Sequence, residues 1–216
     1  SRWVKVRKDS VDLPNGQHID DFYAITINDA AAIVAIDDAQ NIILKKEYRY
    51  CFEQELIEIP AGGFEKGEDA LTVAKRELLE ETGYVSDNWQ YIGATVESSA
   101  KLNNTMHIFF ANHCRKVIEQ HLDPTEELDV LVLPLQQAVE MVMSNEICCS
   151  SSAHGILWVE RILDFCIIQR FQFGGNIGIC RCISKPSLIF FFDVHLNFPH
   201  SMRLLASRAA PMTPAR

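Results

Sequence analysis

The stretch at residues 62–84, GGFEKGEDALTVAKRELLEETGY, constrains the fold of this chain more than any other. It begins with a glycine-rich loop that closely follows a strand-like run, ELIEI, at residues 55–59. Residues 69–82 are mostly good helix formers, and Gly83 is suited to end a helix. We therefore expect a strand, a tight loop and a helix in succession.

Three glutamates lie on one side of this predicted helix. At about 100° per residue, Glu77, Glu80 and Glu81 fall within roughly one third of its circumference. Like charges at this spacing weaken a helix, whereas a bound cation would offset their repulsion, and Mg²⁺ prefers oxygen ligands of this kind. The alternative is a solvated acidic face without a bound ion.

The spacing of glycine, glutamate and arginine over residues 62–84 favours the interpretation that the three glutamates bind a metal ion. Gly62 is followed after five residues by Glu68, and Glu68 is followed after seven residues by RELLEETGY at residues 76–84. This pattern resembles the box of the Nudix hydrolases at every fixed position, although Tyr84 stands where that family more often has an aliphatic residue. The resemblance covers roughly residues 1–166. It implies an α/β protein, the Nudix α/β/α sandwich with a mixed sheet and an N-terminal β-hairpin extension.

The resemblance also implies a reaction, which is the metal-assisted hydrolysis of a diphosphate bond in a nucleoside diphosphate linked to another group. The products would be a nucleoside monophosphate and a phosphorylated remainder. The implied cofactor is Mg²⁺, with Mn²⁺ as a substitute. The implied metal ligands are the Ala61 carbonyl, Glu77, Glu80 and Glu81, with Glu80 also counted as catalytic and with Gly62, Glu68 and Arg76 in supporting roles.

Two segments before the box resemble the branch of the family that acts on ADP-ribose and nucleotide sugars. In that branch an arginine and a glutamate line the substrate cleft, and Arg49 and Glu58 stand at the matching positions. A guanidinium is a natural bidentate partner for a diphosphate. The alternative for Arg49 is a surface arginine on a strand edge. ADP-ribose pyrophosphatases commonly carry a proline in the loop after the box, and residues 97–104 have none, which leaves the substrate open.

An acidic loop, HLDPTEE at residues 121–127, precedes the strand-like run at residues 128–133. Relatives of this branch place a late catalytic glutamate in such a loop, where it acts as general base. Glu126 is the better match and Glu127 the second. The alternative is an ordinary acidic turn.

Three regions are expected along the chain. Residues 1–28 predict a strand extension, and the resemblance implies that it forms a homodimer, the alternative being a simple edge hairpin. Residues 29–166 are expected to form the hydrolase domain. Residues 167–216 contain six basic residues, one acid and six of the twelve phenylalanines, without a clear period. We interpret this atypical tail, whose fold we leave open, as foreign sequence from altered splicing or a shifted reading frame.

The charge and the cysteine content of the chain limit the binding partners and the compartment that we expect. A net charge of −9 argues against non-specific binding to nucleic acid or to anionic membranes. Seven cysteines without a CxxC pair suggest reduced thiols, and no apolar leader or membrane-length run is found, so a cytoplasmic protein is expected. The expected partner is a small nucleoside diphosphate derivative. A nucleoside triphosphate or dinucleotide hydrolase remains an alternative, as does a silent nucleotide sensor, although the intact box glutamates argue against the sensor.

Overall fold

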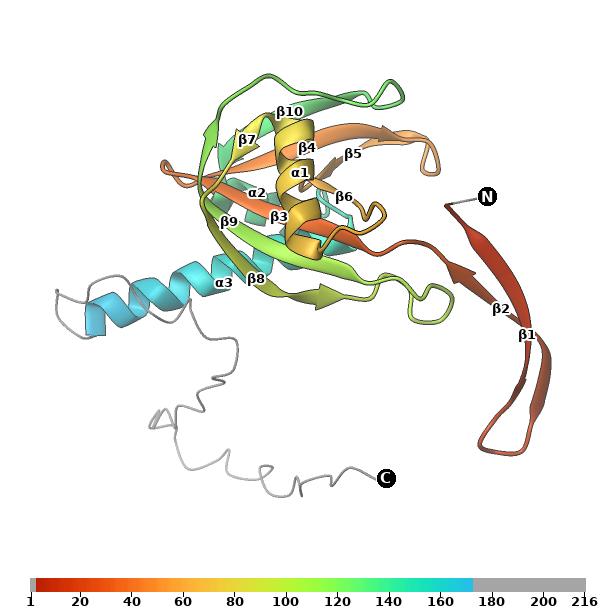
Figure 1. Cartoon of the computed structure of the whole chain (residues 1–216). Coiled ribbons are helices and arrows are strands. Elements are labelled where there is room, and N and C mark those ends of the chain that lie inside the picture. The colour runs from red at the N-terminus through yellow and green to blue at the C-terminus, as the bar shows by residue number, and fades with distance from the viewer. Residues whose placement is uncertain (1–2, 173–216) are drawn as a thin grey trace, which may run out of the picture. The chain divides into compact units, whose positions relative to one another are not determined.

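The computed structural model describes the backbone of residues 3–172 and the side chains of residues 3–164. The predicted tail at residues 167–216 therefore lies outside the described residues, apart from helical backbone as far as Gln172. Figure 1 shows the succession of a hairpin, a mixed sheet and helices packed on that sheet.

A two-stranded antiparallel hairpin precedes the main sheet. β1 (Lys5–Asp12) pairs with β2 (His18–Thr26), and the two strands form a sheet of their own. The turn between them contains Gly16 with φ of 84°, which matches the turn signal PNG at residues 14–16. Several large apolar side chains of this segment are exposed, namely Val4, Val6, Phe22 and Tyr23.

The main sheet is built around β3 (Ala30–Asp37), an apolar run whose residues 31–36 are fully buried. β3 pairs in parallel with β9 (Met106–Lys116) and antiparallel with β4 (Asn41–Arg49), so the sheet is mixed as predicted. Its path runs in the order β10, β4, β3, β9, β7, with β5, β6 and β8 pairing with β4, β3 and β9. The remaining strands are β5 (Gln54–Glu58), β6 (Ala61–Gly63), β7 (Tyr84–Val85), β8 (Asn88–Thr95) and β10 (Leu128–Pro134).

Helices cover both faces of this sheet because the residues of β3 alternate between two cores. Ala31, Ile33 and Ala35 pack with α1 (Ala70–Thr82), whereas the alternate residues pack with α2 (Leu135–Met143) and α3 (Ser150–Gln172). Figure 1 shows α1 on one side of the sheet and α2 and α3 on the other. The predicted α/β/α sandwich is confirmed.

The box helix begins and ends where its sequence predicts. Asp69 caps the N-terminus of α1, and its Oδ1 accepts hydrogen bonds of 3.0 Å from the backbone N–H groups of Leu71 and Thr72. Gly83 caps the C-terminus with φ of 75°, and its N–H donates to the Leu79 carbonyl at 2.8 Å. A Cβ at Gly83 would lie 2.1 Å from the Ile118 carbonyl oxygen, so glycine is required there for space as well as for conformation. Both ends of the helix that carries the glutamates are thus firmly placed.

Among the described residues, no helix combines the length and the apolar character needed to cross a membrane.

Candidate active site

The loop before α1 presses closely on the carboxylates of that helix. β6 pairs with β3, and the Phe64 N–H donates to the Asp29 carbonyl at 2.9 Å, which fixes the loop against the sheet. A Cβ built on Gly62 would lie 2.0 Å from Glu77 Oε1. The glycine therefore lets the backbone of the loop meet a carboxylate directly.

Arg76 connects the loop to two glutamates of α1. Its Nε and Nη2 donate to the two oxygens of Glu68 at 3.0 and 3.1 Å, a bidentate pair. Its Nη1 donates to Glu77 Oε1 at 2.7 Å and to Glu80 Oε2 at 3.1 Å, and its Nη2 donates to the Gly63 carbonyl at 3.1 Å. The hydrogen bonds from Arg76 lower the pKa of Glu68, and those to Glu68 raise the pKa of Arg76. The structure thus brings these predicted residues together around one guanidinium.

Two of the three box glutamates are buried. Glu77 is 8% exposed and Glu81 is 3% exposed, whereas the Glu80 side chain keeps 41% of its surface accessible. Burial raises the pKa of Glu77, against the influence of Arg76. Burial likewise raises the pKa of Glu81 to about 7, and the nearby Glu77 charge adds to this while Lys45 opposes it. The two buried carboxylates of Glu77 and Glu81 therefore form a site that favours a nearby positive charge.

Lys45 supplies positive charge on the buried side of this site, and sequence reasoning missed it. Its side chain is 2% exposed, and its Nζ donates to Glu81 Oε1, lies 3.3 Å from Glu47 Oε2 and donates to the Ala61 carbonyl at 3.4 Å. Burial works to lower the Lys45 pKa, but the ion pair with Glu81, helped by Glu47, outweighs it and raises that pKa. The missed signal was the alternation of charge in KKEYR, where residues 45, 47 and 49 share one face of β4.

Arg49 and Glu58 are brought together by the pairing of β4 with β5. Arg49 Nε donates to Glu58 Oε2 at 3.1 Å, its Nη2 donates to the same oxygen, and its Nη1 donates to Glu47 Oε1 at 2.9 Å. The Arg49 side chain is 36% exposed. Glu47 therefore joins the Arg49–Glu58 pair to the Lys45–Glu81 pair in one continuous charge network.

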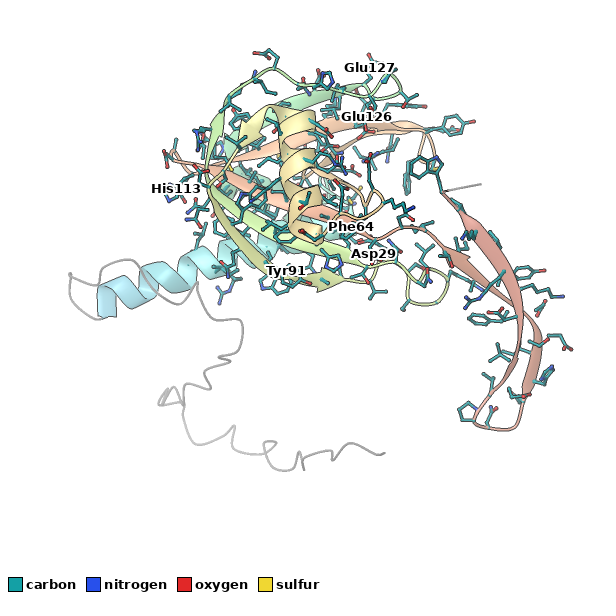
Figure 2. The ribbon with its side chains drawn as sticks, in the orientation of Figure 1. Asp29, Phe64, Tyr91, His113, Glu126 and Glu127 are labelled. Carbon is teal, nitrogen blue, oxygen red and sulfur yellow. The ribbon has the colours of Figure 1, made fainter. Side chains whose placement is uncertain are left out.

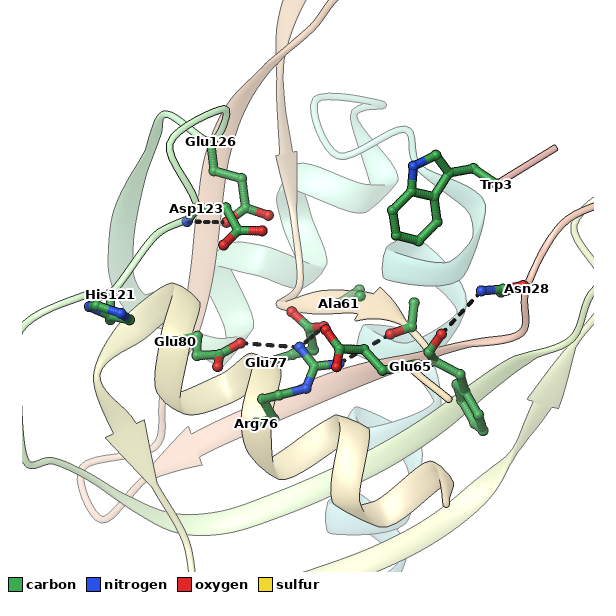
Figure 3. A pocket seen from close by; sticks show the side chains of 13 residues that line it. Trp3, Asn28, Ala61, Glu65, Arg76, Glu77, Glu80, His121, Asp123 and Glu126 are labelled. Carbon is green, nitrogen blue, oxygen red and sulfur yellow. Dashed lines mark hydrogen bonds and ion pairs between the residues drawn. The ribbon is translucent and has the colours of Figure 1, made fainter. Parts of the chain in front are cut away.

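A cavity of about 300 Å³ opens over the box. Figure 3 shows Trp3 and Glu126 facing the cluster of Arg76, Glu77 and Glu80 across it. Its wall includes five carboxylate side chains and one guanidinium, so an anionic ligand would need cations to enter it. The lining residues are Trp3, Asn28, Ala61, Gly62, Gly63, Phe64, Glu65, Arg76, Glu77, Glu80, His121, Asp123 and Glu126.

The two late-loop glutamates differ in their relation to this cavity. They neighbour each other on the loop between β9 and β10 (Figure 2), but only Glu126 of the two lines the cavity as the described residues form it. The Asp123 N–H donates to Glu126 Oε2 at 3.1 Å, and the Glu126 N–H donates to the Asp123 carbonyl at 2.9 Å. The Glu126 carboxylate is thereby held in a tight turn beside the box.

Some residues predicted for the site do not line this cavity, and some residues that were not predicted do line it. Arg49, Glu58 and Glu81 are absent from its lining in the described part of the chain, and Glu81 lies behind it with Lys45. Trp3 and Asn28 reach it from the N-terminal segment, which no spacing in the sequence indicates.

The oxygen donors of the box suit a hard divalent cation. The Ala61 carbonyl and the carboxylates of Glu77, Glu80 and Glu81 offer the ligand chemistry that Mg²⁺ prefers. Among the side chains of residues 3–164, however, no three acidic, histidine or cysteine groups converge on one point as a metal cluster. In this arrangement Arg76 donates to Glu77 and Glu80, while Lys45 donates to Glu81.

Comparison with known proteins gives consistent matches. A family model described as the NUDIX domain matches residues 26–146. An ADP-ribose pyrophosphatase from Bacillus subtilis is 33% identical over 153 residues, which cover 70% of this chain and 82% of the relative. A methanol dehydrogenase activator from Bacillus methanolicus is 31% identical over 160 residues, which cover 74% of this chain and 86% of that relative. A crystal structure of an ADP compounds hydrolase has a TM-score of 0.66 and 21% identity, and the match covers 76% of this chain and 89% of that one.

Proposed function

The chain belongs to the Nudix family as an ADP-ribose pyrophosphatase-like hydrolase, and from this premise we propose that it cleaves ADP-ribose or a nucleotide sugar with the help of a divalent cation. Water would attack one phosphorus of the diphosphate and break its bond to the bridging oxygen. The products would be a nucleoside monophosphate and a sugar phosphate.

The observation that carries this proposal is the acid-rich cavity over the box. Glu77, Glu80 and Ala61 line one wall and Glu126 stands on another. A diphosphate would be repelled by these carboxylates unless cations lay between them and the phosphate oxygens. The cavity is therefore suited to a substrate that arrives together with a metal ion.

Mg²⁺, or Mn²⁺, would be held in the cavity by Glu77 and Glu80, whereas the other two predicted ligands, Glu81 and the Ala61 carbonyl, are bonded by Lys45. A bound divalent ion neutralises phosphate charge and lowers the pKa of a bound water. The protein's own part is to aim these oxygens, which Arg76 does by bonding Glu68, Glu77 and Glu80 at once.

Glu126 would accept the proton of the attacking water. Its carboxylate is fixed by the Asp123 N–H at the rim of the cavity, so it can hold a water opposite the box. Arg49 would contact the substrate by exchanging one of its bonds to Glu58 for a phosphate oxygen, and Glu58 would hold it in readiness until then.

A homodimer formed through the hairpin is part of the proposal. Val6 on β1 and Phe22 and Tyr23 on β2 expose 62%, 37% and 47% of their surfaces. Exposed apolar side chains on a hairpin that forms a sheet of its own favour burial against a second copy.

The activity is tested by measuring the nucleoside monophosphate released from ADP-ribose, nucleotide sugars, dinucleotides and nucleoside triphosphates with Mg²⁺. Hydrolysis of one diphosphate class, reduced at least 100-fold in Glu77→Gln, is the expected result. Preference for triphosphates would move the assignment to the triphosphate hydrolases. Binding of a nucleotide without turnover by folded protein would indicate a sensor.

A further inference from the structure

We propose that Lys45 is a built-in cation that permanently occupies the Glu81 and Ala61 side of the box, so that divalent ions bind only on the Glu77 and Glu80 side. This inference rests on the proposed metal dependence and refines it. It assigns a role to a residue of β4 that lies outside the box.

The first argument is the fit of the lysine to its surroundings. An ammonium group has three N–H donors, and Lys45 Nζ faces three oxygens, one each from Glu81, Glu47 and the Ala61 carbonyl. Two of these oxygens belong to the predicted metal ligands. The ammonium therefore stands where a cation bound by Glu81 and Ala61 would stand.

The second argument is access. Lys45 and Glu81 are 2% and 3% exposed, and Glu81 is absent from the described lining of the cavity. Glu77, Glu80 and Ala61 belong to that lining, but the Ala61 carbonyl oxygen already accepts from Lys45 Nζ at 3.4 Å. An ion that enters the cavity meets Glu77 and Glu80 first. To bind them it has to replace only the hydrogen bonds from Arg76, which is a quarter exposed. To reach Glu81 it would have to displace a buried ammonium from both Glu81 and Glu47.

The third argument is charge balance. Both oxygens of the Glu81 carboxylate already accept a hydrogen bond, Oε1 from Lys45 and Oε2 from the Ala61 N–H at 3.0 Å, and the Lys45 charge balances that of the carboxylate. A second cation beside Lys45 would meet its positive charge in a buried setting, where repulsion is strong. The lysine thus excludes the ion whose place it takes.

The test counts metal ions in the absence of substrate. Mn²⁺ is titrated into the full chain while the free ion is followed by electron paramagnetic resonance, and thermal unfolding is recorded with and without Mn²⁺. The variants are Lys45→Met, the double variant Lys45→Met with Glu81→Gln, and Lys46→Met as control. Lys46 is the next residue of the same strand and pairs with Glu55 at the surface, so its loss changes the charge equally.

The proposal expects one additional Mn²⁺ per chain in Lys45→Met, with a larger rise of Tm on adding Mn²⁺ than in the unsubstituted protein. It expects unchanged counts in Lys46→Met and in the double variant, where the freed carboxylate is also removed. Equal counts in Lys45→Met and the unsubstituted protein would overturn it.

The double variant decides the question even if Lys45→Met does not fold, because it removes both partners of the buried pair together. A count one lower than that of the unsubstituted protein would show that Glu81 binds metal beside Lys45 and would overturn the proposal. None of these measurements uses turnover. A protein with the expected counts that hydrolyses no nucleotide substrate would refute the proposed activity and leave the role of Lys45 standing.

Discussion

Gly62 and Glu77 lie so close that a single methyl group on the glycine would fall 2.0 Å from the glutamate Oε1. The loop at Gly62 and helix α1 can therefore pack this closely only because Gly62 has no side chain. This contact ties the backbone of β6 directly to a predicted metal ligand.

Gly62→Ala should displace the Glu77 carboxylate and impair turnover while the domain stays folded. A shift of about 1 Å in a catalytic group costs on the order of 100-fold in rate, and we expect a fall in kcat of that size. Gly63→Ala is the matched control, because among the described residues no atom lies within 4 Å of a Cβ at Gly63 beyond its chain neighbours. Equal kinetics of the two variants would show that the close contact is without consequence.

Glu126→Gln and Glu127→Gln should separate the two late-loop candidates. Glu126 lines the cavity and is held by the Asp123 N–H, so its loss should lower kcat about 100- to 10,000-fold, the usual contribution of a general base. Glu127→Gln should remain within about threefold of the unsubstituted enzyme, a change worth less than 1 kcal/mol. Steady-state kinetics across pH measures both, and the reverse ranking would transfer the assignment to Glu127.

Arg76→Ala should destabilise the fold and disorganise the box. It removes the shared partner of Glu68, Glu77 and Glu80 and leaves the buried Glu77 carboxylate without its cation. Removing one partner of a buried ion pair costs about 3–5 kcal/mol, and since Arg76 is a quarter exposed we expect about 2–3 kcal/mol in the free energy of unfolding.

Urea denaturation measures this loss, with Arg115→Ala as the control for removing an arginine. Arg115 pairs with Asp87 at the surface, where the two side chains are 57% and 87% exposed, and such pairs are worth about 0–1 kcal/mol. Equal losses in the two variants would mean that Arg76 has no organising role. Added Mn²⁺ should restore part of the stability of Arg76→Ala, because it replaces the missing charge.

Val6→Lys should convert the proposed homodimer to a monomer. The side chain is 62% exposed on β1, so the change leaves the fold of a single chain intact but places charge in the proposed interface. Light scattering after size exclusion measures the mass. Val132→Lys, on the exposed side of β10 at 44% exposure, is the control and should keep the mass of the unsubstituted protein. A protein that is monomeric without any substitution would remove the dimer from the proposal.

The box helix could be predicted closely because its information is local. The cap at Asp69, the apolar positions and Gly83 all lie within one short stretch, and α1 follows them from Ala70 to Thr82. The sandwich was predictable from the family resemblance together with the apolar run of β3.

The site was harder to predict because its parts come from distant segments. The charge alternation in KKEYR marks one face of β4, but it does not say that Lys45 of this strand meets Glu81, which lies 36 positions away and is brought there by packing. Arg49 and Glu58 were predicted to line one cleft, but their direct ion pair arises from the ladder between β4 and β5, which the sequence did not indicate. Trp3 reaches the cavity through the course of the N-terminal segment, which spacing does not reveal.

The parallel pairing of β3 with β9 determines when this site can be assembled. Ala30 lies opposite Met106 and Ala35 opposite Ala111, so the centre of the sheet closes only between segments that are far apart in the chain. Such pairing is slow because a long loop must be closed before any contact rewards it. On the ribosome the glutamates of α1 therefore emerge well before the strand that completes their support. For that interval the nascent chain carries an acidic helix whose apolar face is not yet covered, and such a face is open to aggregation.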